Sequence, residues 1–279
     1  MRLIKPSFEI IEQQPGIDGI YKMIELAGRT CYRSEDRITP DSATAFVDRM
    51  IASGHGAMLE HGTVYLRIPD VSSDGQYVYP AKGKYAGNKY SRLNTKWEGP
   101  ANAQYIVTFV TTNLRVLVEN GWIDDLKYIC EPTEYHEKRV CVRYTSDIHF
   151  YKDCTRHRVF SWAIESTRFC NYIKQKFDSS VSFATPIWLK EEEQEEFEED
   201  LKTIESIYFK WINKGWQPQQ AAYFLIQGTK AEIIMTGFAS DYNHFFDLRS
   251  EIAKTGKPHP TVVELVEPLR QEFIKRGYI

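Results

Sequence analysis

The sequence predicts a mixed helix and strand fold, α/β or α+β, in a single domain that covers residues 1–279. Segments with apolar residues at helical spacing alternate along the chain with short alternating or continuously apolar runs, and neither a repeat nor a linker separates them. Hydrophobic residues make up 42% of the 279 residues, which is enough to bury a sizeable core.

The first part of the chain predicts two helices and one strand. Apolar residues at helical spacing favour a helix over residues 18–31. A second helix should begin at Thr39 and Pro40 and run to Gly54, because a capping hydroxyl before proline at the first helical position is a common helix start. Residues 29–34 are expected as a polar connection, and the alternation over 63–68 predicts a half-buried strand.

The middle of the chain begins with a long stretch, 70–103, that is rich in Gly, Ser, Lys, Tyr and Asn and predicts an irregular insertion. A buried strand is expected at 104–111, a short helix at 113–120 closed by Gly121, and an alternating strand at 138–145. Residues 147–160 predict a helix, because their apolar positions fit the helical repeat and neither Gly nor Pro intervenes.

The last part of the chain is expected to be mainly helical. Residues 190–215 predict a long amphipathic helix whose acidic start is a solvated face that suits the helix dipole. We further expect a helix at 218–225, a strand or helix extension at 231–236, a helix at 243–249 and a last helix at 260–275.

Charge and hydropathy exclude several classes of protein. The net charge is -3, so the chain lacks the global basic surface that gives nonspecific affinity for nucleic acid, and no nucleic-acid partner is expected. No run of 18 apolar residues predicts a membrane span, and the proline at position 6 interrupts the start of the chain too early for a signal peptide. We therefore expect a soluble, cytoplasmic protein.

The cysteines and histidines predict neither disulfides nor a metal site. Five cysteines form no Cys-x-x-Cys pair and are expected to be reduced thiols that serve mostly in packing. The seven histidines are scattered, and no two cysteines have the spacing of zinc ligands. No metal is expected.

One dense polar cluster, residues 156–169, is threaded through apolar residues. It holds three arginines, one histidine, two serines and one carboxylate. Arginine stays charged and presents a planar fork of donors that suits phosphates and carboxylates, and three arginines close together repel unless an anion compensates them. The residues alone leave an exposed basic helix face, balanced by acids elsewhere, as an equal alternative.

The order of these residues resembles the signature of the flavin-dependent thymidylate synthases. Arg156, His157 and Arg158 are followed after seven residues by Ser166, and the similarity continues through Arg168. Residues 54–61 look like the histidine-rich loop of this family before a strand, and residues 243–249 look like its C-terminal active-site helix.

The resemblance implies a fold, an assembly and a reaction. The implied fold is α+β, a twisted and mainly antiparallel sheet flanked by helices, in a homotetramer whose active sites are shared among subunits. The implied reaction is the reductive methylation of dUMP to dTMP, with FAD as cofactor and with methylenetetrahydrofolate and NADPH as co-substrates. In enzymes of this family the flavin and an arginine that polarises the pyrimidine replace the cysteine thiolate of other thymidylate synthases.

The resemblance also implies roles for particular residues. The residues implied to bind the flavin are His55, Glu60, Arg156, His157, Arg158, Asn243 and His244. The residues implied to bind the nucleotide are Asp153, Arg156, Glu165, Ser166, Thr167, Arg168 and Arg249. The residues implied in catalysis are Arg249, Ser166 and Arg168, and no metal is implied.

Other roles remain open for several of these residues. A histidine at a loop and strand junction, as His55 is, more often serves in capping or packing. Arg249 matches the arginine that stabilises the anionic pyrimidine ring, and its alternative is a surface arginine at a helix C-terminus. Cys154 and Cys170 flank the motif, where nearby arginines could lower a thiol pKa. Because a buried free cysteine is commonly a small hydrophobe, we expect neither to bond to the nucleotide.

The sequence departs from the family pattern in two places. Many members have Asn-Glu where this chain has Ala163 and Ile164, and a carboxylate appears only at Glu165. The family arginine that holds the nucleotide phosphate falls near Ala222, in a stretch without arginine. These departures keep two alternatives open. One is a flavoenzyme that modifies C5 of another pyrimidine nucleotide, such as dCMP, or makes a hydroxymethyl product. The other is a flavin- or nucleotide-binding protein without catalysis.

Overall fold

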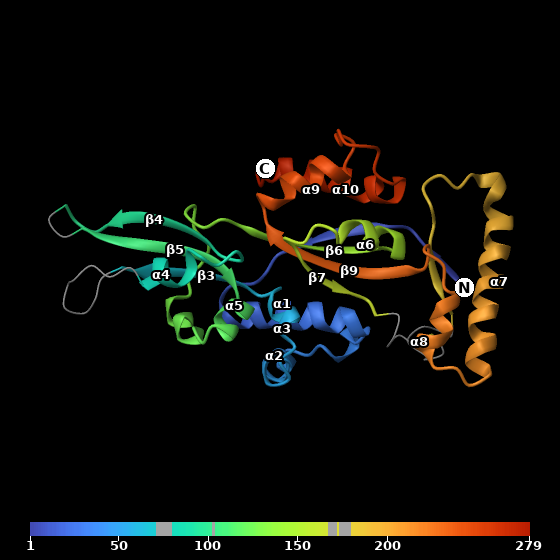
Figure 1. The fold of residues 1–279 in the computed structure, drawn as a ribbon, viewed down its shortest axis with the longest axis horizontal. Helices are drawn as coiled ribbons and strands as arrows, with labels where there is room; N and C mark the ends of the chain where they lie inside the picture. The colour runs from blue at the N-terminus through green and yellow to red at the C-terminus, as the bar shows by residue number, and fades with distance from the viewer. Residues whose placement is uncertain (71–79, 102–103, 167–171, 173–179) are drawn as a thin grey trace.

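The molecule is elongated, with a four-stranded sheet at its centre, a three-stranded sheet towards one end and the long helix α7 at the other end (Figure 1). The structure is a computed structural model, and it describes residues 1–70, 80–101, 104–166, 172 and 180–279. The central sheet has the strand order β2, β6, β9, β7, and every neighbouring pair is antiparallel. Its strands are β2 (Ser7–Ile11), β6 (Arg139–Asp147), β7 (Ser161–Ile164) and β9 (Lys230–Phe238).

Both faces of the central sheet are buried under helices. Cys141, Ala163 and Ile234 pack in one core against α1 (Gly16–Tyr32). Their strand neighbours, such as Val142 and Met235, pack in a second core on the opposite face, against α9 (Asp241–Arg249) and α10 (Pro260–Lys275). Successive strand residues point to opposite faces, so strands that are covered on both sides carry apolar side chains on both faces along their covered part. Figure 1 shows α9 and α10 on one side of the sheet and α1 on the other.

The three-stranded sheet has the order β3, β5, β4 and is antiparallel. Its strands are β3 (Thr63–Pro69), β4 (Arg92–Glu98) and β5 (Tyr105–Asn113). The expectation of an irregular insertion over 70–103 is wrong for its described part, which holds α4 (Pro80–Tyr85) and all of β4. The sequence did not predict β4, because this edge strand is largely exposed and its polar residues resemble those of a loop. Charged side chains on such an edge discourage pairing with other chains.

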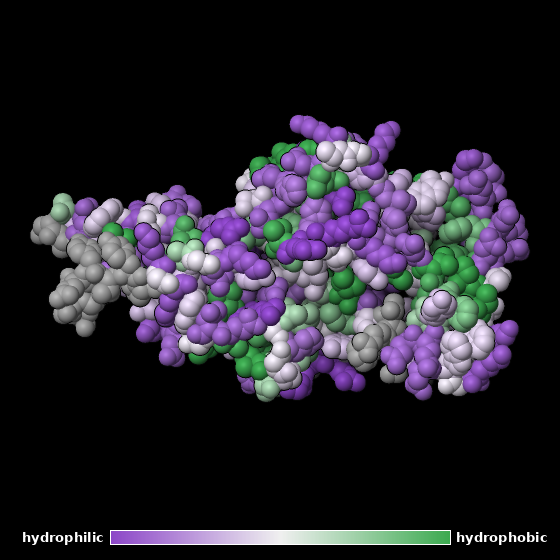
Figure 2. Space-filling view, viewed as in Figure 1, coloured by the Kyte–Doolittle hydropathy of each residue, from purple (hydrophilic) through white to green (hydrophobic). Residues whose placement is uncertain are grey.

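The smallest sheet ties the N-terminus to the α7 end. Strand β1 (Arg2–Ile4) pairs in parallel with β8 (Ser182–Ala184). The long acidic helix is confirmed as a short 3-10 turn (Glu191–Glu193) and α7 (Gln194–Asn213), with Leu201 and Tyr208 buried. It is followed by α8 (Pro218–Ala221) and a 3-10 turn (Ala222–Phe224). On the face seen in Figure 2, hydrophobic residues gather beside α7 and the centre of the molecule is largely hydrophilic.

The remaining short elements connect these layers. They are a 3-10 turn (Glu35–Arg37), α2 (Ser42–Ala52), α3 (Gly56–Leu59), α5 (Leu114–Glu119), a 3-10 turn (Ile123–Tyr128) and α6 (Ile148–Cys154). The predicted start of the second helix at Thr39 and Pro40 is wrong by two to three residues, because α2 begins at Ser42, after a turn in which Thr39 N donates to the Ser42 hydroxyl at 2.9 Å. The polar connection expected at 29–34 is also wrong in part, since α1 continues to Tyr32.

The α+β class is confirmed, since the two larger sheets are antiparallel and helices flank the central one. The strands divide into three sheets, and residues 231–236, left open between strand and helix, belong to β9. No helix in the described ranges is long and apolar enough to cross a bilayer. That residues 1–279 form a single domain stays a prediction.

Candidate active site

The signature Arg156, His157 and Arg158 lies in a turn between α6 and β7, which we call the 156–158 turn. Asp147 caps α6 by accepting a hydrogen bond from Phe150 N at 2.7 Å, and the helix ends at Cys154. The expectation of a helix to Phe160 is therefore wrong. The reason is tertiary, because Phe160 is buried against Gly237 and Ser161 begins the pairing of β7 with β9.

The 156–158 turn points His157 inwards. His157 is 8% exposed, and its ring makes edge contacts with Phe245 at 5.0 Å and His244 at 5.8 Å between centroids. Burial, together with the nearby Arg249 and His244, lowers the pKa of His157 to about 4. The imidazole is therefore neutral at pH 7, between the motif and α9.

Arg249, the last residue of α9, lies beside this histidine. Its Nη2 donates to the Asp153 carbonyl at 3.2 Å and its Nη1 to the Leu248 carbonyl at 3.3 Å. The buried Nε has no hydrogen-bond partner among the described residues, and no described carboxylate forms an ion pair with the guanidinium. The positive charge of an arginine that contacts only neutral carbonyls is not compensated by a carboxylate, so it can attract an anionic ligand.

Arg156 and Arg158 point outwards, in contrast to His157. Both side chains are exposed, and neither makes a hydrogen bond or an ion pair with another described residue. Asn243 and His244, near the start of α9, are also exposed. The structure thus brings Asp153, His157, His244 and Arg249 together, and the exposed Arg156 and Arg158 flank His157 in the chain without a partner among the described residues.

Glu60 and His55, the predicted residues before β3, lie in different surroundings. The Glu60 carboxylate pairs with Arg115, and the Glu60 carbonyl accepts a hydrogen bond from Arg139 Nη2 at 3.0 Å. His55 precedes α3 at the surface, and its side chain makes no described contact with another predicted site residue. The structure therefore leaves His55 apart from the group around His157.

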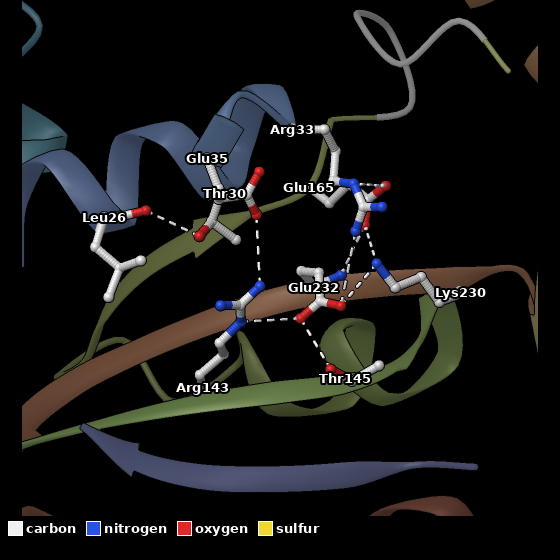
Figure 3. Close-up of polar contacts among 9 residues, drawn as sticks. All are labelled: Leu26, Thr30, Arg33, Glu35, Arg143, Thr145, Glu165, Lys230 and Glu232. Carbon is white, nitrogen blue, oxygen red and sulfur yellow. Dashed lines mark hydrogen bonds and ion pairs between the residues drawn. The ribbon is translucent and has the colours of Figure 1, made fainter. Parts of the chain in front are cut away.

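Glu165 lies in a buried ion network rather than at the surface (Figure 3). Its carboxylate is 2.9 Å from Lys230 Nζ and 3.7 Å from Arg33 Nε. Lys230 also contacts Glu232 at 2.7 Å. Arg33 reaches Glu165 from the end of α1, where it adopts a left-handed conformation with φ of 48°.

The same network extends along β9 and β6. Arg143 Nε donates to Glu232 at 3.1 Å and Arg143 Nη2 to Glu35 at 3.4 Å, so three cations and three carboxylates face one another. Next to the network, Ser166 N donates to the Cys31 carbonyl at 2.9 Å. The network therefore fixes the end of β7 from which the second half of the signature continues. Thr167, Arg168 and Cys170 lie outside the described residues.

Cys154 and His61, which are buried in the core, do not resemble catalytic groups. Cys154 is fully buried, and burial raises the pKa of its thiol. His61 is also fully buried, with Nδ1 2.9 Å from the Thr236 hydroxyl. Burial, together with the nearby Arg139, lowers the pKa of His61 to about 3. In the described ranges, no three His, Cys, Asp or Glu side chains gather as a metal site.

These buried histidines predict a loss of stability in mild acid. The unfolded chain takes up protons below pH 6.5, whereas folded His61 and His157 resist protonation down to about pH 3 and 4. Stability therefore falls as pH decreases from 6.5, by up to about 1.4 kcal/mol per pH unit for each histidine. We measure the free energy of unfolding by denaturant at several pH values between 6 and 5. Its slope against pH should be smaller in His61→Gln than in the wild type, by about that amount. His55→Gln, a substitution at an exposed histidine, is the control, and equal slopes for both variants would contradict the assignment.

Comparison with known proteins adds a second line of evidence. Residues 132–260 match the family model described as thymidylate synthase complementing protein. A flavin-dependent thymidylate synthase of Mycobacterium leprae (strain Br4923) is 32% identical over 92 residues, which are 32% of this chain and 35% of that protein. A flavin-dependent thymidylate synthase of Mycolicibacterium vanbaalenii is 40% identical over 57 residues, which are 20% of this chain and 23% of that protein. Over this segment, the chain resembles that family.

The resemblance that the signature predicted is thus confirmed, and its extent is limited. The match spans about a third of the length of the Mycobacterium leprae flavin-dependent thymidylate synthase. Among solved structures, the UMP/dUMP methylase PolB from Streptomyces cacaoi bound with 5-Br dUMP aligns with a TM-score of 0.44 and 13% identity, over 99% of this chain and 93% of that one. The segment that matches the thymidylate synthase complementing family holds the 156–158 turn, Glu165 and Arg249, whereas His55 and Glu60 precede it.

Sequence reasoning missed several charged residues around this family segment. Lys230 and Glu232 hold Glu165, and Arg139 links the Glu60 loop to β6. Lys230 and Glu232 are two residues apart at the start of a strand, which places both on one face, and this spacing was a usable signal. No sequence signal pointed to Arg33 or Arg139, because their partners are distant in the sequence.

Proposed function

We propose that this chain is an enzyme that methylates C5 of dUMP to give dTMP, with FAD as cofactor and with methylenetetrahydrofolate and NADPH as co-substrates. The observation that carries the proposal is the Arg249 guanidinium, held by the Asp153 carbonyl beside a neutral His157, in a segment that matches the family model. The proposal includes a homotetramer with shared active sites. It also includes the cytoplasm as the location.

The residues of the 156–158 turn fit a flavin with its diphosphate. Arg156 and Arg158 are exposed, charged and unpaired among the described residues, so both guanidinium forks are available to phosphate oxygens. The His157 and His244 rings lie behind them, edge to face, with their centroids 5.8 Å apart. A bound, reduced flavin would supply the hydride that completes the methyl group.

Arg249 then has an electrostatic role towards the pyrimidine. The C5 carbon is a poor nucleophile until electron density moves into the ring, and negative charge develops on the ring oxygens as it does so. A preorganised guanidinium stabilises that charge without reorganising during the reaction. Since the Cys154 thiol is buried with a raised pKa, we propose no covalent bond between the enzyme and the nucleotide.

Ser166 and Arg168 are proposed to hold the nucleotide, together with Thr167. The backbone N–H of Ser166 is already bonded to the Cys31 carbonyl, which fixes the position of this residue at the end of β7. Asp153 contributes its carbonyl to Arg249. The Asp153 side chain lies 3.8 Å from His149 and is partly exposed.

The surroundings of Glu165 favour a second candidate function. Its carboxylate is committed to Lys230, Arg33 and Glu232 N, and Ala163 is buried in the core under α1. These contacts leave neither position free to recognise a uracil edge. A different base, as in dCMP, or a hydroxymethyl product is therefore the alternative. Turnover assays with dUMP and dCMP, with products weighed by mass spectrometry, distinguish the two. Flavin binding without turnover would favour a protein without catalysis.

The flavin assignment predicts that Arg156→Ala combined with Arg158→Ala loses bound FAD. Each charge-assisted contact is worth roughly 1.5 to 3 kcal/mol, so the affinity should fall about 100-fold or more. Flavin absorbance per protein after gel filtration measures the occupancy. Arg37→Ala combined with Lys257→Ala, which removes two exposed cations elsewhere, is the matched control. Full occupancy in the first variant would refute the assignment.

A further inference from the structure

A cavity of about 220 Å³ lies next to the 156–158 turn and has strongly basic walls. Its lining brings together Lys89 from the turn before β4, Arg92 from the start of β4, Arg139 from β6, and Arg158. We call it the basic cavity. Its volume is far larger than the roughly 15 Å³ that a single water molecule needs. The four cations come from three segments that are distant in the sequence.

Arg139 is the buried wall of the basic cavity. It is 8% exposed, and its donors reach only neutral acceptors, with Nη1 3.3 Å from the Thr63 hydroxyl and Nη2 3.0 Å from the Glu60 carbonyl. Its Nε is buried and has no partner within the described part of the chain. No described carboxylate makes an ion pair with Arg139, and a buried charge without such a contact is costly, so this guanidinium is suited to an anion that enters the cavity.

The other walls leave an excess of positive charge. Arg92 lies over the Phe238 ring at 4.4 Å, and two carboxylates approach it at long distance, Glu137 at 3.5 Å and Asp241 at 3.7 Å. Among the described residues that line the cavity, Asp241 is the one carboxylate, against four cations. Arg158 is unpaired among the described residues, and the Lys89 amine lies 4.8 Å from the Tyr90 ring centre.

The sequence lacks an arginine at the position where the resembled family binds the nucleotide phosphate. The position where the family places a phosphate-binding arginine falls near Ala222. In this structure Ala221 is buried in the core beside α7, and Tyr223 is 86% exposed. The sequence from Gly215 to Thr229 contains neither lysine nor arginine, whereas four cations line the basic cavity.

We propose that the basic cavity binds the phosphate of a nucleotide ligand, with Lys89, Arg92 and Arg139 acting together with Arg158. This inference rests on the proposed function and adds to it the phosphate site. Two sources share the chemistry, namely the monophosphate of the pyrimidine nucleotide and the diphosphate of the flavin. Two of the four cations come from the stretch 70–103, which would give that segment a binding role.

The test uses the full chain and calorimetric titration with four probes, which are inorganic phosphate, pyrophosphate, dUMP and FAD. The variant combines Lys89→Gln with Arg92→Gln, since neither side chain is buried and folding should survive. Its matched control combines Lys82→Gln with Lys96→Gln, two exposed cations in the same part of the chain. We expect the affinity for at least one nucleotide probe to fall about 10- to 100-fold in the variant only.

The identity of the affected probe distinguishes the two sources. A fall for dUMP with unchanged FAD assigns the monophosphate, and the reverse assigns the diphosphate. In both cases the wild-type affinity should weaken with added salt more than that of the variant, because fewer charges then contribute. Unchanged affinity for dUMP and FAD in the variant, or an equal loss in the control, would overturn the inference. Binding is measured without turnover, so an inactive protein whose phosphate affinity depends on Lys89 and Arg92 would refute the proposed function and leave this inference standing.

Discussion

Arg249→Lys is expected to lower nucleotide turnover by roughly 100- to 1000-fold while FAD stays bound. Lysine keeps the charge but loses the planar fork, with which arginine contacts the Asp153 carbonyl and still presents donors to a ligand. Arginine and lysine are therefore not equivalent at this position.

Single-turnover assays with dUMP, beside flavin titration of the same preparation, measure the two effects separately. Arg270→Lys is the matched control, because Arg270 pairs with Glu267 on α10 and is remote from the proposed chemistry. Equal losses of turnover and flavin affinity in Arg249→Lys would point to a structural role. Unchanged turnover would remove Arg249 from the mechanism.

Lys230→Met should destabilise the fold by about 3 to 5 kcal/mol, because it leaves buried carboxylates with fewer partners. The side chains of Lys230, Glu165 and Glu232 are 10%, 4% and 7% exposed, so water cannot replace the lost amine. Methionine keeps the length of the aliphatic stem and removes only the charge. At roughly 2 to 4 °C per kcal/mol, the Tm should fall by about 6 to 20 °C.

Thermal and denaturant unfolding measure this loss, and Lys22→Met is its control. Lys22 also pairs with a carboxylate, Asp18 at 2.6 Å, but both side chains are largely exposed, so less than about 1 kcal/mol is expected. Replacing Glu165 by Gln in the Lys230→Met background should recover part of the stability. A Tm of Lys230→Met within 2 °C of the Lys22→Met value would show that Arg33 and Arg143 alone satisfy the carboxylates.

The network also gives stability that depends on pH. Burial raises the pKa of Glu232, but Lys230, Arg143 and the Thr145 hydroxyl together hold it below the usual 4.5. A lowered carboxylate pKa contributes stability that is present above pH 4.5 and is lost as pH falls through the folded-state value. The contribution of His61 and His157 to stability is already lost from pH 6.5 downwards. Unfolding measured over one pH series therefore separates the contribution of the histidines from that of Glu232.

The sequence determined the elements whose local pattern agrees with their tertiary surroundings. The helix at 260–275 and the strand at 63–68 were predictable because apolar spacing and burial coincide there. The signature at 156–166 likewise gave the family resemblance, since it depends on residue order alone. Charged edge strand β4 was not predictable, because its exposed polar residues resemble those of a loop.

Only the tertiary structure decided which charged residues meet. The 147–160 pattern suited a helix, yet pairing with β9 drew Ser161–Ile164 into a strand and left the signature in a turn, with His157 inside and its two arginines outside. Arg33, Glu165 and Lys230 come from three distant segments, as do Arg92, Arg139 and Arg158. Electrostatic contacts between such residues leave no periodic pattern in the sequence, because they depend on chain topology. That topology is fixed by the packing of both faces of the central sheet.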